Sequence, residues 1–329
     1  MKISVIGATG KVGRAMALSL VLSEGMMPLD VSLYARNTQR VKGLEMELQS
    51  VPARNPNLNF ATAEGIEETL EGADMVVMMA AAWPDAEEQA HFAKMDPSGR
   101  LAQVGPNVAT VRALAEDMKE HAPNAKMLMV TNQSDILSEI ARGTLNPESV
   151  IGFGGLLDTL RLRHAMRAEY NGSEAFPDED AMMVGYHNGM MRPLYSTLSQ
   201  RMQEKDHLLQ SVWDKARIRG KVISDYNTNT NYPEINSGAS IDSGYAVAAT
   251  ILAFSGNGEG IEAPYNIALD KRTAEQYGVR KDIGLSVPVR ISHGSIGSTA
   301  TRYAVNEDEQ SHFANAQNDI RDTLGQLKL

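Results

Sequence analysis

The sequence predicts an α/β fold, in which a doubly wound parallel sheet is followed by a mixed α+β domain. Three short apolar runs without alternation, at residues 2–6, 75–80 and 127–130, are typical of strands buried on both faces of a parallel sheet. Helix-compatible patterns lie between these runs, as strand–helix–strand units require. A chain of 329 residues suits two domains of ordinary size, which we place at residues 1–150 and 151–329.

Composition narrows the classes of function. With 43% hydrophobic and 22% charged residues, the chain is typical of a globular protein. A formal charge of −10 argues against nucleic acid or an anionic membrane as the main partner. The sequence has no Cys, which excludes thiol catalysis, disulfides and Cys-ligated zinc. No apolar run approaches the roughly 20 residues of a membrane span. The sequence begins with a strand pattern in place of a signal or transit peptide. We therefore expect a cytoplasmic protein with a small-molecule partner.

The first apolar run, residues 2–6, ends in the turn GATGKVG, and a helix-compatible segment follows at residues 14–23. This order of strand, glycine-rich turn and helix is the context of a dinucleotide-binding loop in a Rossmann-type fold. Gly7 and Gly10 would let the backbone approach a pyrophosphate, and Gly13 would let the helix pack on the strand. The alternative is an ordinary tight turn between a strand and a helix.

The second strand, residues 31–34, ends next to Ala35, a position where dinucleotide sites often place an acidic residue. Such an acid binds the adenine ribose 2′-hydroxyl and would repel a 2′-phosphate. The residues that follow are polar, and two of them are basic: Arg36, Asn37, Thr38 and Arg40. This pattern favours NADP over NAD as the cofactor. The alternative is a solvated polar loop whose charges have no function.

A long polar stretch, residues 81–99, follows the strand at the centre of the predicted sheet. It contains Trp83 near its start and is closed by Arg100. Loops of this length in compact domains are usually functional or disordered. After a helix expected at residues 104–119, the next strand delivers Asn132 to the carboxyl edge of the sheet, where open α/β sheets bind ligands. A turn-forming Asn is the alternative for that residue.

The stretch at residues 150–163, VIGFGGLLDTLRLR, joins an apolar, Gly-rich run to a helix-like pattern with unlike charges. Asp158 and Arg161 are three residues apart, so on a helix they share one face. A carboxylate and a guanidinium could then point into one cavity beside Gly154 and Gly155. The alternative is an ion pair on the helix surface, which is common and contributes little.

The rest of the chain carries one further candidate and several ordinary elements. His187 follows an apolar run at residues 181–185, and a lone His at a strand end is more often structural than catalytic. The other expected elements are helices at 198–217, 240–253 and 308–327, a polar turn region at 227–231, and an alternating strand at 285–291 followed by turns at Gly294 and Gly297. The 18 Met residues lie mostly in apolar runs and indicate core packing.

Several of these motifs, in this order, resemble those of the L-lactate and malate dehydrogenase family. They are GATGKVG, the loop closed by SGR at Arg100, VTN at Asn132, the stretch at 150–163, His187 after a strand, SGAS at 237–240 before a helix, the LSVPVRI hairpin and the final EDEQ helix. Each motif is short, but together they span nearly the whole chain. The resemblance also implies a homodimer or a homotetramer.

The resemblance implies a role for each matching residue. It makes His187 the general acid and base, and Asp158 the partner that orients the imidazole. It makes Arg161 a bidentate clamp for the substrate carboxylate, and it places Arg100 on the mobile loop, where it would polarise the reacting carbonyl. The implied substrate-binding residues are Asn132, Arg161, Trp83 and Ser240. The implied cofactor-binding residues are Gly7, Thr9, Gly10, Lys11, Val12, Gly13, Ala35, Arg36, Asn37, Thr38, Asn107 and Asn132.

Departures from the family pattern bear on the substrate. Malate dehydrogenases place an Arg early in the mobile loop to pair the second carboxylate, whereas residues 83–99 offer only His91 and Lys94 as residues that are or could be cationic. An unpaired carboxylate in a closed site would be costly, and Trp83 suggests an apolar or aromatic substrate tail. Gln133 also stands where the family has Pro.

We therefore expect an NAD(P)-dependent 2-hydroxy acid dehydrogenase that transfers a hydride to a 2-oxo acid with no second carboxylate. One alternative is a malate dehydrogenase that acts on oxaloacetate, with Lys94 in place of the missing Arg. An alternative from another class is a cofactor-binding protein that has lost catalysis and serves as a sensor or scaffold. The complete set of His187, Asp158, Arg161 and Arg100 argues against that alternative.

Overall fold

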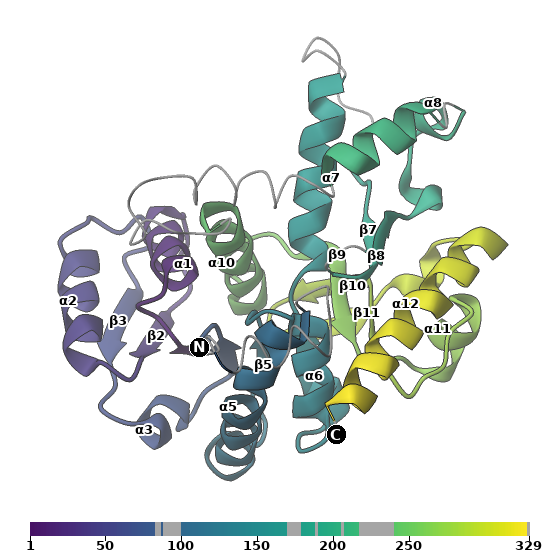
Figure 1. Cartoon of the computed structure of the whole chain (residues 1–329). Coiled ribbons are helices and arrows are strands. Elements are labelled where there is room, and N and C mark those ends of the chain that lie inside the picture. The colour runs from purple at the N-terminus through teal and green to yellow at the C-terminus, as the bar shows by residue number, and fades with distance from the viewer. Residues whose placement is uncertain are drawn as a thin grey trace.

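The computed structural model describes residues 1–82, 87, 100–169, 179–187, 190–204, 207–216 and 240–327, with the backbone alone at residues 100–103. The predictions about Trp83 and its loop and about the turn region at 227–231 lie outside the described residues. One sheet runs through the molecule, from the N-terminal strands at the left of Figure 1 to the C-terminal strands at the right.

Parallel strands form the N-terminal half of the sheet, in the order β3-β2-β1-β4-β5-β6. The strands are β1 (Lys2–Ile6), β2 (Leu29–Tyr34), β3 (Leu58–Thr62), β4 (Met75–Met78), β5 (Lys126–Met129) and β6 (Val150–Gly152). The helices between them are α1 (Lys11–Leu22), α2 (Thr38–Gln49), α3 (Ile66–Leu70), α5 (Arg100–His121), α6 (Ser134–Arg142) and the 3-10 turn η1 (Pro147–Ser149). The strand order reverses between β1 and β4, which is the switch point where such sheets bind ligands. The predicted doubly wound parallel sheet is confirmed.

Antiparallel strands continue the sheet beyond β6, in the order β9-β10-β7-β8, and β11 pairs with β10. These strands are β7 (Met183–Tyr186), β8 (Met190–Pro193), β9 (Ile261–Ile267), β10 (Leu285–Ser292) and β11 (Ser295–Ser298). Gly152 of β6 pairs with Asn266 of β9, so the change of strand direction falls close to residue 150. The division into two domains at that residue stays a prediction.

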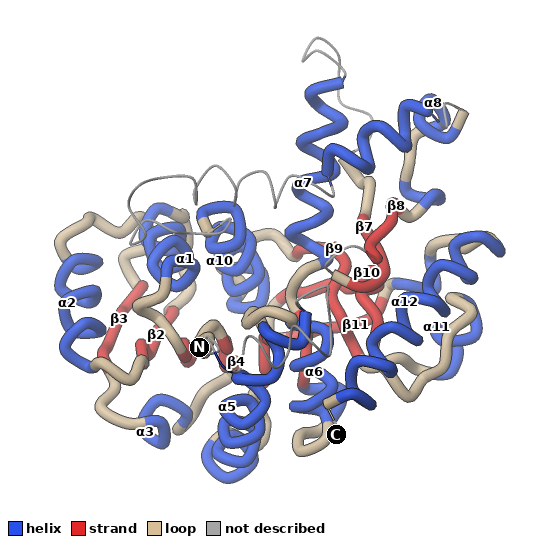
Figure 2. Tube along the Cα trace, in the orientation of Figure 1, coloured by secondary structure: helices blue, strands red, loops and turns tan. Residues whose placement is uncertain are grey.

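The remaining helices surround the antiparallel strands. They are α7 (Gly155–Glu169), η2 (Tyr195–Thr197), α8 (Gln200–Gln203), a helix at 207–216, α10 (Ile241–Ser255), α11 (Lys271–Gln276), η4 (Ala300–Arg302) and α12 (Glu307–Gln326). Figure 2 shows α7 rising away from the sheet, with α8 to the right of its upper part. Within the described residues, no helix is both long and apolar enough to cross a membrane.

The parallel strands are buried on both faces, as their unbroken apolar runs predict. Val77 and Leu128 belong to one core cluster, which includes residues of α1, α7 and α10. Their neighbours Val76 and Met127 point to the opposite face and join a second cluster with α5, α6 and α12. Figure 1 shows α1 and α10 side by side above the sheet and α5 below it. The core therefore fixes the carboxyl ends of β1, β4 and β5 relative to one another.

The single helix predicted at residues 198–217 is wrong in part. The helix α8 ends at Gln203, and a separate helix covers residues 207–216. The side chain of Gln203 donates hydrogen bonds to the carbonyl oxygens of Tyr195 and Leu198, at 3.1 and 2.8 Å. These bonds tie the short helix back onto the η2 turn, so it does not continue directly into the next helix.

One of the two predicted C-terminal turns is also wrong. The connection between β10 and β11 is made at His293 and Gly294, which have φ angles of 48° and 74°. Gly297 lies inside β11 instead, where it pairs with Arg290 of β10. A glycine in an edge strand gives the same sequence signal as a glycine in a turn, and only the strand pairing separates them.

Candidate active site

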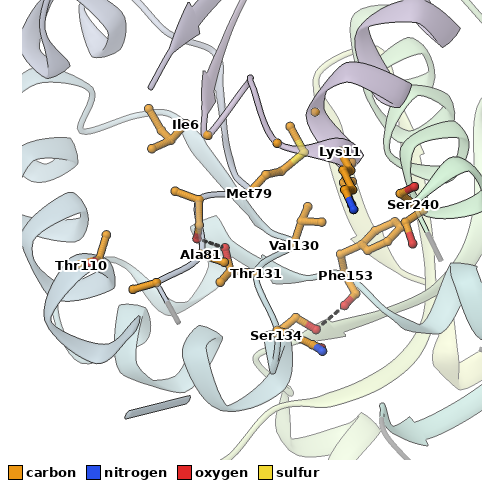
Figure 3. A pocket seen from close by; sticks show the side chains of 18 of the residues that line it. Ile6, Lys11, Met79, Ala81, Thr110, Val130, Thr131, Ser134, Phe153 and Ser240 are labelled. Atoms are coloured by element: carbon orange, nitrogen blue, oxygen red, sulfur yellow. Dashed lines mark hydrogen bonds between the residues drawn. The ribbon is translucent and has the colours of Figure 1, made fainter. Parts of the chain in front are cut away.

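A cavity of about 1470 Å³ lies at the carboxyl ends of the parallel strands. Its lining comes from the glycine-rich turn after β1, the ends of β2, β4 and β5, and helix α5, together with α7, β7 and the start of α10. Figure 3 shows Lys11 and Ser240 on one side of this cavity and Thr110 on the opposite side. The predicted cofactor loop and the predicted polar residues of α7 therefore share one pocket.

The glycine-rich turn has the close contacts that only glycine permits. All six residues predicted there line the cavity: Gly7, Thr9, Gly10, Lys11, Val12 and Gly13. Gly7 has a φ of 94°, and a Cβ on it would lie 2.4 Å from the backbone N of Ala80. A Cβ on Gly13 would lie 2.4 Å from the carbonyl O of Ala8. The first turn of α1 has no side-chain cap at Gly10, so its backbone N–H groups are suited to an anion such as a pyrophosphate.

The end of β2 forms another part of the lining. Ala35, Arg36, Asn37 and Arg40 line the cavity, whereas Thr38 does not. The side chain of Asn37 accepts a hydrogen bond from the backbone N of Arg40 at 3.0 Å and so caps α2. Ala35 brings no carboxylate to the strand end, and two guanidinium groups stand close by in the chain.

The two predicted asparagines have different roles. Asn132 lines the cavity after β5 and is joined to Gln133 by a cis peptide bond. Asn107 of α5 is buried and lies outside the lining. Its side chain accepts a hydrogen bond from the backbone N of Ala82 at 2.7 Å and donates one to the carbonyl O of Ala82 at 3.1 Å. Asn107 therefore fixes the start of the long loop, and its predicted contact with the cofactor stays a prediction.

His187 follows β7 and contacts carboxylates from two other segments. Its Nδ1 lies 2.6 Å from Oδ2 of Asp158 on α7. Its backbone N–H donates to Oδ2 of Asp135 on α6 at 2.8 Å. Gly154 makes room for the ring, because a Cβ at that position would lie 2.7 Å from Cγ of His187. With Nδ1 engaged, Nε2 is the ring nitrogen that can exchange a proton in the cavity.

The charges around His187 shift the pKa values of the whole cluster. Burial alone would lower the pKa of His187, but the carboxylates of Asp158 and Asp135 outweigh burial and raise it. Burial would raise the pKa of Asp158, but His187 and Arg161 hold it below its ordinary value. Burial raises the pKa of Asp135 to about 6, despite the opposing effect of His187. The cluster therefore favours an imidazolium paired with the Asp158 carboxylate.

Arg161 lies one helical turn after Asp158 and contacts two carboxylates. Its Nη1 is 3.3 Å from Oδ1 of Asp158. Its Nε and Nη2 are 3.3 and 3.2 Å from Oδ2 of Asp242 on α10. The side chain is 11% exposed and lines the cavity. An ordinary ion pair on the helix surface, the alternative left open by the sequence, does not describe this arrangement, because Asp158 also contacts His187.

Several residues in or next to the cavity lining were not predicted from the sequence. Asp242 lies in the first turn of α10, where an acid ordinarily indicates only a favourable charge near a helix N-terminus. Its position two residues after Ser240, which lines the cavity as expected, is the available signal. The apolar wall beside His187 has no signal beyond hydrophobicity and consists of Phe153, Leu157, Met183, Met191 and Ala216. On the cofactor side, α5 contributes Thr110 and Asp117.

Two residues predicted from the long loop stay predictions. Arg100 is the first residue of α5, but its side chain lies outside the described part of the chain. Trp83 lies outside it entirely. Ala81 and Ala82, at the start of the loop, line the cavity, so the loop begins at the edge of the site.

A glycine-rich turn at the switch point of a parallel sheet, facing a His–Asp pair across one cavity, defines a nicotinamide-dependent oxidoreductase. Residues 1–152 match the family model described as the lactate/malate dehydrogenase, NAD binding domain. The malate dehydrogenase of Methanothermobacter thermautotrophicus is 24% identical over 332 residues, which cover 98% of this chain and 96% of that protein. The first 152 residues thus match the NAD binding domain of lactate/malate dehydrogenases, and nearly the whole chain is similar to a malate dehydrogenase, so the predicted resemblance is confirmed.

Solved structures share the fold over the whole chain. The apo malate dehydrogenase of Picrophilus torridus has a TM-score of 0.79 at 20% identity, with 99% of this chain and 97% of that chain covered. MGS-M5, a lactate dehydrogenase from a Medee basin deep-sea metagenome library, has a TM-score of 0.79 at 19% identity, with 100% and 99% covered. These comparisons support an oxidoreductase of the lactate/malate dehydrogenase type that uses a nicotinamide dinucleotide.

Proposed function

We propose that this enzyme transfers a hydride reversibly between NADP(H) and a 2-oxo acid that has no second carboxylate, with the (S)-2-hydroxy acid as the reduced partner. The observation that carries the proposal is the placement of His187, Asp158 and Arg161 in the same cavity as the glycine-rich turn. A proton donor and a cation for a carboxylate thus lie on one wall, opposite the site for a dinucleotide.

The residues present fit a nicotinamide dinucleotide. Gly7 and Gly13 have no side chain at positions where a Cβ would clash with the backbone. Lys11 points into the cavity beside the start of α1 (Figure 3). These groups would bind the pyrophosphate by backbone N–H groups, the helix dipole and one positive charge. When bound, the cofactor supplies or accepts the hydride at C2 of the substrate.

His187 holds the proton that completes the reaction. In the direction of reduction, its Nε2–H donates to the carbonyl oxygen of the 2-oxo acid, and in the direction of oxidation Nε2 accepts the hydroxyl proton. Asp158 orients the ring through Nδ1 and stabilises the imidazolium. Asp135 fixes the backbone of His187 from α6. The proton donor is thereby held in one orientation at the cavity wall.

Arg161 is the cation suited to bind the substrate carboxylate. The other cations among the described lining residues, Lys11, Arg36 and Arg40, belong to the glycine-rich turn and the end of β2. The wall beside His187 is apolar instead, and it includes Leu157, Met183, Met191 and Ala216. Such a wall suits an aliphatic or aromatic tail and would leave a second carboxylate unpaired. These contacts support a substrate with one carboxylate.

The preference for NADP rests on the end of β2. Ala35 carries no charge that would repel a 2′-phosphate, and the guanidinium groups of Arg36 and Arg40 belong to the same part of the lining. A phosphate in this part of the cavity would gain charge-assisted hydrogen bonds. An NAD site would instead gain from an acid that accepts from the ribose 2′-hydroxyl.

A panel of 2-oxo acids with graded tails, assayed with NADPH and with NADH, tests the proposal. We expect the highest kcat/KM for a monocarboxylate with an aliphatic or aromatic tail and with NADPH. A large preference for oxaloacetate would overturn the proposed substrate class. A preference for NADH would overturn the assignment at Ala35 and Arg36 without affecting the substrate result.

Malate dehydrogenase activity is the second candidate, because the curated relative and one of the solved structures carry that name. It requires a cation for the second carboxylate, and Lys94 is the candidate from the loop. A Lys94→Ala variant that loses turnover of oxaloacetate while retaining that of pyruvate would support it. Tight cofactor binding with no turnover of any 2-oxo acid would instead support the sensor or scaffold alternative.

We also propose that the enzyme is a homo-oligomer built on the surface of α1 and α10. These helices pack side by side and expose large apolar side chains: Leu18 (46%), Leu22 (50%), Ile241 (80%) and Tyr245 (59%). Apolar side chains grouped on one surface mark protein interfaces. Light scattering of the purified protein should give at least twice the mass of one chain, and a Leu22→Glu variant should reduce it. The cytoplasmic location stays a prediction.

A further inference from the structure

Asp242 is a partly exposed carboxylate that has no role in the proposed mechanism, yet both of its oxygens accept hydrogen bonds. Oδ2 accepts hydrogen bonds from Nε and Nη2 of Arg161, at 3.3 and 3.2 Å. Oδ1 accepts a hydrogen bond from the backbone N of Ser243 at 2.8 Å. The neighbouring residues Ser240 and Ser243 and the guanidinium of Arg161 all line the cavity. Asp242 is therefore fixed at the position where a substrate carboxylate is expected to bind.

The edge of the guanidinium that Asp242 occupies is a binding edge for carboxylates. A planar guanidinium presents its N–H groups as a fork, and its Nε/Nη2 edge can bind a carboxylate in a bidentate contact. Asp158 contacts the other terminal nitrogen, Nη1. Two carboxylates thus compensate the single charge of Arg161 before any substrate arrives. An incoming anion has to compete with one of them.

Burial and contacts indicate which of the two carboxylates gives way. Asp158 is 15% exposed and is also held by Nδ1 of His187 at 2.6 Å. The side chain of Asp242 is 31% exposed, and within the described part of the chain its other hydrogen bond comes from one backbone N–H in its own helix turn. Displacing Asp158 would also break the pair with His187, whereas displacing Asp242 exposes a carboxylate that water can already reach.

We propose that Asp242 is a specificity-determining residue: it occupies the carboxylate clamp of Arg161 until a substrate carboxylate displaces it, and it then remains beside the substrate as a fixed negative charge. This inference rests on the proposed function. Because like charges in a partly desolvated site repel each other, a substrate with a second carboxylate is penalised more than one with an apolar tail. The charge of Asp242 and the apolar wall then select for the same class of substrate.

A competing explanation predicts the opposite change in carboxylate binding when Asp242 is replaced. If Asp242 serves only to orient Arg161, its removal frees the guanidinium and weakens the binding of any carboxylate. If Asp242 competes for Arg161, its removal strengthens that binding. Asp242→Asn separates the two explanations, because the amide oxygen can still accept from Ser243 while the negative charge is lost.

The test compares the wild type with Asp242→Asn and with a matched control, Asp282→Asn. Asp282 also pairs with arginines, at 3.0 Å from Arg280 and 3.3 Å from Arg321, but these arginines, unlike Arg161, do not line the cavity. Calorimetry with oxamate, a non-reacting carboxylate shaped like pyruvate, in the presence of reduced cofactor gives a readout that needs no turnover. Thermal unfolding of all three proteins checks that the fold is intact.

We expect Asp242→Asn to bind oxamate about tenfold more tightly than the wild type, and Asp282→Asn to match the wild type. We also expect KM to fall more for oxaloacetate than for pyruvate, with a smaller change in kcat. Unchanged or weaker oxamate binding, or no oxamate binding by either protein, would overturn the proposal. Tighter oxamate binding without turnover of any 2-oxo acid would uphold the role of Asp242 and overturn the proposed function alone.

Discussion

Asp158 and His187 are 29 residues apart in the chain, yet Oδ2 of the first lies 2.6 Å from Nδ1 of the second. The contact joins the first turn of α7 to the end of β7, and it raises the pKa of His187 against the effect of burial. A carboxylate on one ring nitrogen fixes the imidazole and leaves the other nitrogen for the reaction. Five predictions test this cluster and the cofactor site around it.

Replacement of His187 by Ala should remove the proton donor without changing the cofactor site. We expect kcat for the reduction of a 2-oxo acid to fall by roughly 10²–10⁴-fold, with the Kd for the reduced cofactor changed less than about twofold, since His187 lies across the cavity from the glycine-rich turn. Steady-state kinetics and cofactor fluorescence measure the two quantities. His207→Ala, on the exposed side of the helix at 207–216, is the control. Turnover retained by the His187 variant would show that the donor is misassigned.

Replacement of Asp158 by Asn should move the pH dependence. The pKa of His187 is raised above 6.5 by Asp158, so the imidazolium persists to higher pH. Reduction needs the protonated ring, so its rate is constant at low pH and falls as the pH rises through that pKa. Without the charge of Asp158, burial lowers the pKa, and the fall should shift to lower pH. A profile of kcat/KM between pH 5 and 9 measures it, and an unshifted profile would rule out this role for Asp158.

Replacement of Asp135 by Asn should raise the free energy of unfolding at high pH and leave it nearly unchanged at low pH. Burial raises the pKa of Asp135 from 3.8 to about 6, so the folded state favours the protonated carboxyl. Its contribution to stability is present below pH 3.8 and is lost as the pH rises to about 6. The amide keeps an acceptor for the backbone N–H of His187. We expect the free energy of unfolding to rise by about 1–3 kcal/mol at pH 8 and to change little at pH 4. Equal changes at both pH values in urea unfolding would contradict this.

Replacement of Ala35 by Asp should reverse the cofactor preference. A carboxylate at the end of β2 can accept from a ribose 2′-hydroxyl and repels a 2′-phosphate. We expect the ratio of kcat/KM for NADPH over NADH to fall by about a hundredfold, because like charges placed side by side cost several kcal/mol. Arg36→Gln should lower the same ratio by a smaller factor. If neither variant changes the ratio, the end of β2 does not discriminate between a ribose 2′-hydroxyl and a 2′-phosphate.

Replacement of Gly154 by Ala tests the space around the imidazole. The new Cβ would lie 2.7 Å from Cγ of His187, which is closer than van der Waals contact allows. The ring has to shift away from Asp158, and we expect kcat to fall by about 10²-fold from misplacement. Gly43→Ala in α2 is the matched control, because a Cβ there meets nothing within 4 Å. That variant should instead gain about 0.5–1 kcal/mol in stability at unchanged kcat.

Much of the fold is determined locally and could be predicted from the sequence. An unbroken apolar run such as residues 2–6 can only be buried on both faces, and the turn that follows needs glycine at positions 7 and 13 because a Cβ would clash with backbone. The predictions were wrong where one sequence pattern is compatible with two different structures. Gly297 lies in a strand rather than a turn, and the predicted helix at 198–217 is interrupted after Gln203.

The site was predictable only as a set of separate residues. The spacing of Asp158 and Arg161 shows that both lie on one face of α7, because a helix repeats every 3.6 residues. No local sequence pattern indicates that His187 contacts Asp158. The same holds for the contact of Asp135 with His187, 52 residues away, and for that of Asp242 with Arg161, 81 residues away. The sequence likewise does not indicate that Asn107 accepts a hydrogen bond from the backbone N of Ala82.

By itself, therefore, the sequence determined the parallel sheet, the glycine-rich turn, the charged face of α7 and the family resemblance. Each of these follows from contacts between residues close in the chain or from the order of short motifs. The family resemblance implied the pair of Asp158 with His187. Only the tertiary structure decided that Asp135 and Asp242 join the cluster, because those distances depend on how α6, α7, α10 and β7 pack around one end of the sheet. Arg161 shows the difference most directly: its place on α7 is local, but its contact with Asp242 exists only in the folded chain.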